Sequence, residues 1–142
     1  MIRFFVQGLP KSMSVSSSVA FKRNGVKHSC QKRAHTEWAT LVGHIGRQHA
    51  PERPLAGPVA LHVTFRMPRP TSAGKHVLVP IKRPDLDNLL HKLTDQWNGV
   101  FWEDDSQIVD LIVRKRFADN GVPGALFAID RITVGQLTVA GV

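Results

Sequence analysis

The chain has 142 residues, enough for one domain that buries a hydrophobic core without disulfide bonds or a structural metal. Its single cysteine, Cys30, excludes an intramolecular disulfide and a Cys/His zinc site. The formal net charge of +8, with 19 Lys and Arg residues, favours a nucleic acid or another anion as partner. The sequence has no apolar run long enough for a membrane span and no signal-peptide pattern at its start, so we expect a cytoplasmic protein with no membrane association.

The first half of the chain predicts a strand, an irregular basic segment and a helix. Residues 2–7 have the composition of a short strand. Residues 11–30 are rich in serine and carry scattered basic residues, and Asn24-Gly25 is a turn signal that could join two weak strands. This segment is either a mobile surface loop or an arm that touches a phosphate backbone. Residues 31–49 predict a helix with an apolar stripe made of Ala34, Trp38, Leu41, Val42 and Ile45.

The second half predicts three strands and a second helix. Residues 59–67 alternate between apolar and polar side chains, as a half-buried strand does, and a proline-containing loop follows. Two further strands are expected over 107–117 and 125–134. A helix is expected over 86–97, with a buried stripe made of Leu86, Leu89, Leu90, Leu93 and Trp97. This order predicts a single α+β domain over residues 1–142, with a small mixed or antiparallel sheet covered by two main helices.

Acidic side chains are concentrated in one part of this basic protein. Residues 82–105 hold six of its 11 acids, beside Lys82 and Arg83. Asp85 and Asp87 stand where the second helix should begin, and an acid there can simply cap the helix and meet its dipole. Glu103, Asp104 and Asp105 come where the next strand should begin.

A second interpretation applies if the carboxylates at the start of the helix and those at the start of the strand converge. Their mutual repulsion would then need a compensating cation, and Mg²⁺ prefers oxygen ligands together with water and substrate phosphate. Such an ion can activate water and stabilise the charge that develops in phosphodiester cleavage. Lys82 and Arg83 would hold phosphates beside it. The spacing alone does not establish whether the acids meet within one chain.

The same stretch resembles the RusA family of Holliday-junction resolvases. The resemblance is strong over about 30 residues and weaker elsewhere. It rests on a Pro-Asp-x-Asp-Asn-Leu motif, a downstream Asn-Gly turn and an Asp-Asp-x-Gln-Ile motif that opens a strand. In this chain these are Pro84-Asp85-Leu86-Asp87-Asn88-Leu89, Asn98-Gly99 and Asp104-Asp105-Ser106-Gln107-Ile108.

The resemblance implies a homodimeric endonuclease, dependent on Mg²⁺ with Mn²⁺ as the alternative ion, that cuts four-way DNA junctions by paired nicks in recombination and repair. Carried over by position, the metal-binding and catalytic acids are Asp85, Asp87 and Asp105, with Asp104 adjacent and able to assist. Asp95 lies two helical turns beyond Asp87 and is expected to be structural or to support the ligands, and not to bind the metal itself.

One position departs from the family pattern. The family often has a catalytic lysine four residues after the second Asp of the first motif, where this chain has His91, and the lysine follows as Lys92. One residue on a helix is a rotation of about 100°, so Lys92 could replace that lysine only after a register change. His91 could donate to a phosphate when protonated or orient water, or it could be an ordinary surface residue. Both are kept as candidate catalytic residues.

Basic side chains elsewhere predict a DNA-binding surface. Lys82, Arg83, Arg69, Lys75, Arg114 and Arg116 are the candidates, and their contacts would be to phosphates. Trp102, beside the acids, could pack under the site or touch an unstacked base. Two alternatives remain open: a noncatalytic or weakly active branched-DNA-binding protein of the same fold, and a nuclease that acts on flaps.

Overall fold

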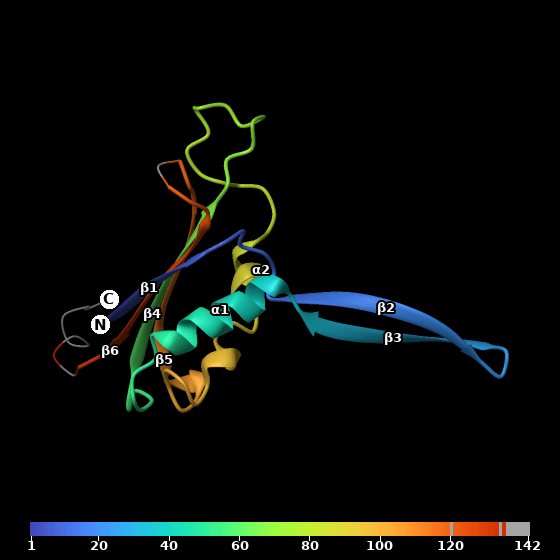
Figure 1. The fold of residues 1–142 in the computed structure, drawn as a ribbon, viewed down its shortest axis with the longest axis horizontal. Coiled ribbons are helices and arrows are strands. Elements are labelled where there is room, and N and C mark those ends of the chain that lie inside the picture. Colours follow the sequence, from blue (N-terminus) through green and yellow to red (C-terminus); the bar gives the residue numbers. More distant parts are fainter. Residues whose placement is uncertain (120, 134, 136–142) are drawn as a thin grey trace.

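A mixed four-stranded sheet forms the body of the molecule (Figure 1). The computed structural model describes residues 1–119, 121–133 and 135, except for the side chains of 14–23 and 26–35. The strands are β1 (Ile2–Gln7), β4 (Val59–Met67), β5 (Ile108–Phe117) and β6 (Gly124–Arg131), in the order β1-β6-β4-β5. β4 and β5 run parallel, and the other two pairs are antiparallel. The predicted α+β class with a small mixed sheet and two helices is confirmed.

Helix α1 (Glu37–Gln48) crosses one face of this sheet (Figure 1). Its first residue is set by Thr36, whose Oγ1 accepts a hydrogen bond from the amide of Ala39 over 3.2 Å and donates to the carbonyl of Ser12 over 2.8 Å. The prediction of a helix from residue 31 was therefore wrong in its first residues. Residues 26–35 pair with another strand instead, and that pairing satisfies the backbone groups that a longer helix would have used.

The segment that could have been a loop or two strands is a hairpin that projects from the body (Figure 1). Strands β2 (Ser14–Arg23) and β3 (Val26–His35) pair antiparallel in full register. Asn24 and Gly25 join them with φ angles of 49° and 79°, the left-handed pair that a tight two-residue turn requires.

The predicted second helix is broken. Helix α2 covers only Leu86–Leu90, and a 3-10 turn, η1 (Asp95–Trp97), follows after an irregular turn. Lys92 has a φ of 58°, which takes it out of any right-handed helix. Leu89, Leu93 and Trp97 are nevertheless fully buried, but Leu86 is 36% exposed and Leu90 only half-buried, so the predicted buried stripe was right for three of its five residues.

An aromatic cluster explains why burial prevails over helix continuity here. The ring centroid of Trp97 lies 5.1 Å from those of both Phe101 and Phe127, and the ring centroids of Phe4 and Phe127 are also 5.1 Å apart. Gly46 of α1 lets the helix approach this cluster, because a Cβ there would lie 2.6 Å from the indole nitrogen of Trp97. In the described part of the chain, no helix has the length and apolar character needed to cross a bilayer.

Candidate active site

Asp85 and Asp87 stand at the start of α2, as predicted. Asp85 occupies the N-cap position with an extended backbone, φ −74° and ψ 155°, but its carboxylate makes no capping hydrogen bond. Both side chains are exposed to solvent. Helix capping is therefore not what the carboxylate of Asp85 does in this structure.

Asp104 is the residue that acts as a helix cap. Its Oδ1 accepts the amide of Ser106 over 2.9 Å at the start of the 3-10 turn η2 (Asp105–Gln107). Hydrogen bonding from the side chain of Ser106, and then from its backbone amide, lowers the pKa of Asp104 below its ordinary value. Gln107 completes a capping box, because its Oε1 accepts the amides of Glu103 and Asp104 over 2.7 and 3.1 Å. The Asp-Asp-Ser-Gln motif is thus a self-contained turn that presents Asp105.

This turn is also fixed to the rest of the fold. Nε2 of Gln107 donates to the carbonyls of Leu55 and Gly57 over 2.8 and 2.9 Å. The half-buried Asp105 accepts from Oγ1 of Thr94 over 3.3 Å. Thr94 lies just after the irregular turn that ends α2, so this hydrogen bond links the two acidic segments. Sequence reasoning missed Thr94, because nothing in its local pattern marks it.

The described residues include no group of three His, Cys, Asp or Glu side chains that could hold a metal ion. Asp85 and Asp87 lie two residues apart at the start of α2, and Asp105 is hydrogen-bonded to Thr94 of the segment that follows, but the structure does not gather the three carboxylates into one ligand group. In chemistry the three carboxylates suit a hard cation, since Asp85 is not engaged as a cap and Asp105 has one oxygen outside its bond to Thr94. The metal-binding role of these acids stays a prediction.

Comparison with known proteins decides the family. The model of the family described as endodeoxyribonuclease RusA matches residues 13–126, which include both acidic segments. The chain is also 31% identical over 128 residues to the uncharacterized protein YqaN of Bacillus subtilis strain 168, an alignment that covers 83% of this chain and 89% of that relative.

The chain belongs to the RusA family. The family resemblance predicted from the two acidic motifs is thereby confirmed. Membership implies an endodeoxyribonuclease that acts on Holliday junctions, a branched form of DNA.

The RusA lysine position now has a structural context. His91 ends α2 with φ −49° and ψ 126°, and Lys92 follows with its left-handed φ of 58°. The expectation that Lys92 is held one helical step, about 100°, away from that position was wrong, because neither residue is helical. Both side chains are exposed, and the backbone amide of His91 donates to the carbonyl of Asp87 over 2.8 Å.

Lys115 anchors the segment that carries the RusA motif, a role that the sequence did not reveal. Its Nζ donates to the carbonyls of Lys82 and Pro84 over 2.8 and 2.9 Å, so β5 holds the chain directly before Asp85. The one available signal was strand alternation, which placed Lys115 on the opposite face of β5 from Arg114 and Arg116. Lys82 and Arg83 themselves are exposed on this segment, as predicted.

Arg69 anchors the other end of the same loop. Its Nε and Nη2 donate to the carboxylate of Asp119 over 2.6 and 2.8 Å, and its Nη1 donates to the carbonyls of Gly74 and Val77 over 3.2 and 2.9 Å. The guanidinium also lies over the ring of Phe117, 4.1 Å from its centroid. These contacts use most of its donors, whereas Lys75 on the loop is exposed.

The remaining predicted DNA contacts lie elsewhere. Arg114 and Arg116 are exposed on the face of β5 away from Lys115, in register with Thr64 and Arg66 of β4. The structure therefore does not bring them to the loop that carries Lys82 and Arg83. Trp102 is fully buried, and its indole nitrogen donates to Oδ1 of Asn98 over 2.9 Å, so it packs beneath the acidic turn rather than against a base.

Proposed function

We propose that this protein is a Mg²⁺-dependent, structure-specific endodeoxyribonuclease that resolves four-way DNA junctions by paired nicks in recombination and repair. One observation carries the proposal: in a chain of the RusA family, Asp85 stands at a helix start without serving as its cap. An exposed carboxylate with no hydrogen-bonding task, beside a second one, is available to ligand and substrate chemistry. Mn²⁺ is expected to substitute, because it shares the preference for oxygen ligands.

Different residues of the chain would have different roles in cleavage. Asp85, Asp87 and Asp105 would hold the ion, which when bound supplies positive charge to the scissile phosphate and lowers the pKa of water. Lys82 and Arg83, exposed on the anchored segment just before Asp85, bind the flanking phosphates and place the phosphodiester. His91 or Lys92 supplies a proton or positive charge to the departing oxygen. Thr94 keeps Asp105 in one orientation.

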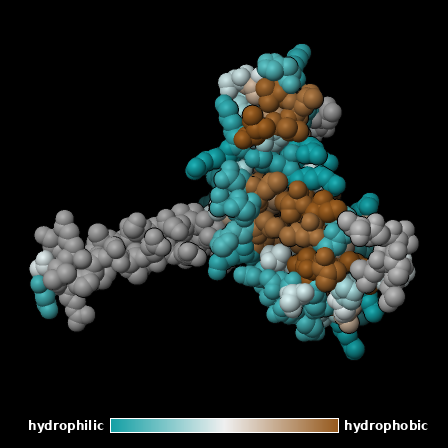
Figure 2. All heavy atoms as spheres, turned by 180° about the vertical axis from the view of Figure 1, so that it is seen from behind, coloured by the Kyte–Doolittle hydropathy of each residue, from teal (hydrophilic) through white to brown (hydrophobic). Residues whose placement is uncertain are grey.

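The junction has two strands to cut, so we propose a twofold homodimer. The face of the sheet that α1 leaves open offers a contact between copies. Seen from behind, the body of the molecule has apolar residues gathered in its centre, with hydrophilic ones around them (Figure 2). Strand register places Phe5, Leu126, Ala128 and Ile112 in the middle rows of the open face, where they alternate with the polar or basic side chains of Arg3, His62, Thr64 and Arg114.

Charges at the two ends of this open face support the pairing. Asp110 and Asp130 both neighbour Ala60 at one end, and Arg66 and Arg116 are partners at the other. A twofold axis through the apolar middle would set the acidic end of one copy against the basic end of the other. The two ends of the face would then be complementary in charge across the axis, as an isologous contact requires.

The test is a panel of fixed four-way junctions, flaps and plain duplexes, each incubated with Mg²⁺, Mn²⁺ or neither. The wild-type protein should nick junctions symmetrically, only with a metal ion. Asp85→Asn, Asp87→Asn and Asp105→Asn should each lower the nicking rate at least about a hundredfold while junction affinity is kept, since the charge stabilisation lost is worth several kcal/mol. Asp95→Asn, a change in the same segment, serves as the matched control.

Each alternative has its own result in this panel. Junction binding without cutting in either metal would identify a noncatalytic binding protein, and faster cutting of flaps than of junctions would identify a flap nuclease. Undiminished nicking by Asp85→Asn would refute the assignment of the site.

A further inference from the structure

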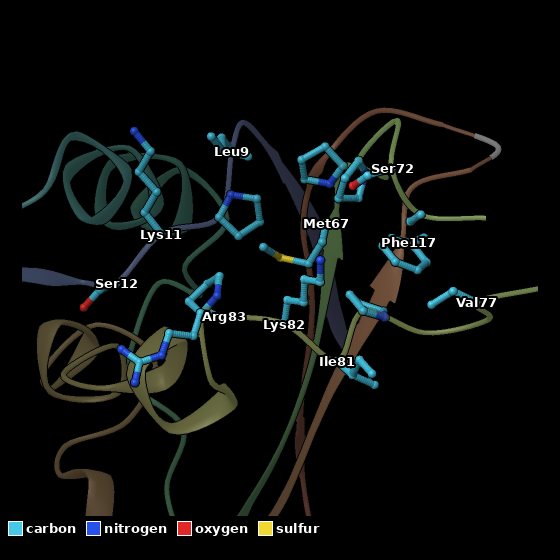
Figure 3. A pocket seen from close by; sticks show the side chains of 16 residues that line it. Leu9, Lys11, Ser12, Met67, Ser72, Val77, Ile81, Lys82, Arg83 and Phe117 are labelled. Atoms are coloured by element: carbon cyan, nitrogen blue, oxygen red, sulfur yellow. The ribbon is translucent and has the colours of Figure 1, made fainter. Parts of the chain in front are cut away.

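A cavity of about 560 Å³ lies beside the acidic site, and none of the described residues that line it is acidic. It opens where the parallel strands β4 and β5 end. One wall is the connection from β1 to β2, and the other is the loop from β4 to α2. Figure 3 shows Leu9, Lys11 and Ser12 on one side, Val77 and Ile81 on the other, and Met67 between them.

The lining is apolar with basic residues added. Most of its side chains are aliphatic, aromatic or proline, and Lys11, Lys82 and Arg83 are its charged members, all exposed. Ile81 is 83% exposed, an unusual position for an apolar side chain unless something covers it. The ligand that matches this lining has a flat or compact apolar part and negative charge beside it.

The walls are held in place before any ligand arrives. Lys115 binds the carbonyls of Lys82 and Pro84, and Arg69 binds those of Gly74 and Val77, so both parts of the loop are anchored to the sheet. A preformed cavity loses little entropy when it is filled. This favours a binding site over a gap that closes by chance.

Position connects the cavity to the cleavage site. Arg83 and Pro84 line the cavity, and Asp85 is the next residue. The Cα atom of Asp85 therefore lies no more than about 7 Å from that of Arg83 in the cavity wall. A strand whose phosphodiester lies at Asp85 therefore passes the mouth of the cavity with its neighbouring nucleotides. Resting on the function proposed above, we infer that the cavity receives one unpaired nucleobase adjacent to the cleaved phosphodiester, with Lys11, Lys82 and Arg83 on the phosphates around it.

Branched DNA lowers the free-energy cost of placing a base in the cavity. A base in a continuous duplex must be unstacked at a cost of a few kcal/mol, and the cost is least where pairing is already absent. The branch point of a junction is such a place. Stacking against apolar walls repays about 1–3 kcal/mol per base. The cavity thus selects the branch point without reading sequence, and a plain duplex cannot fill it.

The experiment scans a fixed four-way junction with abasic nucleotides on either side of each mapped nick. Affinity is measured without metal, and nicking is measured with Mg²⁺. For the wild type, removal of one particular base per strand should weaken binding about tenfold. Ala73→Trp fills the cavity, so the intact junction should bind about tenfold more weakly and the abasic change should add nothing further. Ala56→Trp, an exposed alanine outside the cavity, is the control and should match the wild type.

Ile81→Ser is a second test of the cavity in case Ala73→Trp does not fold, because it removes an exposed apolar side chain from the wall and leaves the core unchanged. It should show the same non-additive loss, of smaller size. A wild-type scan with no sensitive position, or equal abasic losses in wild type and Ala73→Trp, overturns the inference. Unchanged junction affinity in Ala73→Trp would also overturn the inference, and would favour an apolar peptide as the ligand of the cavity. Failure of the proposed function looks different, since the wild type would then not nick the intact junction with Mg²⁺, whether or not it binds it.

Discussion

Thr94 donates a hydrogen bond from its Oγ1 to Oδ2 of Asp105 over 3.3 Å. The two residues belong to separate segments, one just after the turn that ends α2 and the other at the start of η2. Asp104, the neighbour of Asp105, is occupied as the cap of η2. The Thr94 bond is therefore a side-chain contact that links Asp105 to the segment following α2 and restricts its carboxylate.

Thr94→Val should lower the rate of junction nicking about tenfold and leave junction affinity within about twofold, because the hydroxyl orients a carboxylate and does not touch DNA. Thr94→Ser keeps the hydroxyl and should restore most of the rate. The measurement is single-turnover nicking of a fixed junction, with Thr71→Val as an exposed control. Equal rates for Thr94→Val and the wild type would remove Thr94 from the site.

Lys115→Met should release the segment before Asp85 from β5. Both carbonyl contacts of its ammonium group would be lost, which predicts a free energy of unfolding lower by about 1.5–3 kcal/mol. Nicking should fall by tenfold or more even at temperatures far below the midpoint of unfolding, since Asp85 follows the released segment directly. Thermal melts and nicking assays on the same samples measure both effects.

Arg53→Met removes an exposed cation from a different loop and is the matched control for Lys115→Met. It should alter neither stability nor nicking. If both variants lose the same small amount of activity, general loss of positive charge explains the result and the anchoring role of Lys115 is rejected.

Period-two alternation was sufficient to predict β4 and its buried face, because each of Val59, Leu61, Val63, Phe65 and Met67 is buried. Turn chemistry likewise identified Asn24-Gly25. The helix over 86–97 could not be predicted correctly, since residues 91–94 contain neither glycine nor proline to signal the break. The turn there depends on burying Leu93 and Trp97 against distant aromatic rings, which is a tertiary effect.

In the acidic site, too, local sequence patterns predicted some features and tertiary contacts determined the others. The motif pointed to Asp85, Asp87 and Asp105, and the structure gives Asp85 and Asp105 no competing task as a cap. It was local geometry that distinguished Asp104 from Asp105, because only the backbone angles determine which of two adjacent acids caps the turn. The anchors Lys115 and Arg69 act on carbonyls up to 33 residues away in the chain, which no local pattern reveals.

The ion pair between Arg69 and Asp119 predicts a pH dependence of the loop from β4 to α2. The hydrogen bond from Arg69 lowers the pKa of Asp119 below its ordinary value. A carboxyl group with a lowered pKa in the folded state stabilises the fold above its unfolded pKa, about 4, and this contribution is lost as pH falls through the folded pKa. The loop should therefore loosen in acid.

Asp119→Asn isolates this contribution from Asp104, whose pKa is also lowered. The variant should melt at a lower temperature than the wild type at pH 7, and the difference should shrink as pH falls below about 4 toward the lowered pKa of Asp119 in the folded state. Limited proteolysis should show earlier cleavage within the loop in the variant at pH 7. Glu52→Gln, an exposed change elsewhere, should track the wild type at every pH. A melting difference that is constant from pH 7 to pH 3 would contradict the role of the Asp119 charge.

Leu126→Glu tests the pairing of two copies through the open face of the sheet. Leu126 is 37% exposed in one copy and lies in the apolar middle of that face, so a twofold contact would bury it. A carboxylate placed there would be desolvated against an apolar partner, and the dimer should dissociate at least about tenfold more readily. Sedimentation over a range of concentrations measures this dissociation. Val122→Glu, an exposed apolar residue outside the strands, should leave the association unchanged.

Arg66→Asp and Arg116→Asp should weaken the dimer, and the added change Asp110→Arg should restore it, because the proposed contact pairs these ends across the axis. Dimers of unaltered strength in Leu126→Glu would place the contact between copies on another surface.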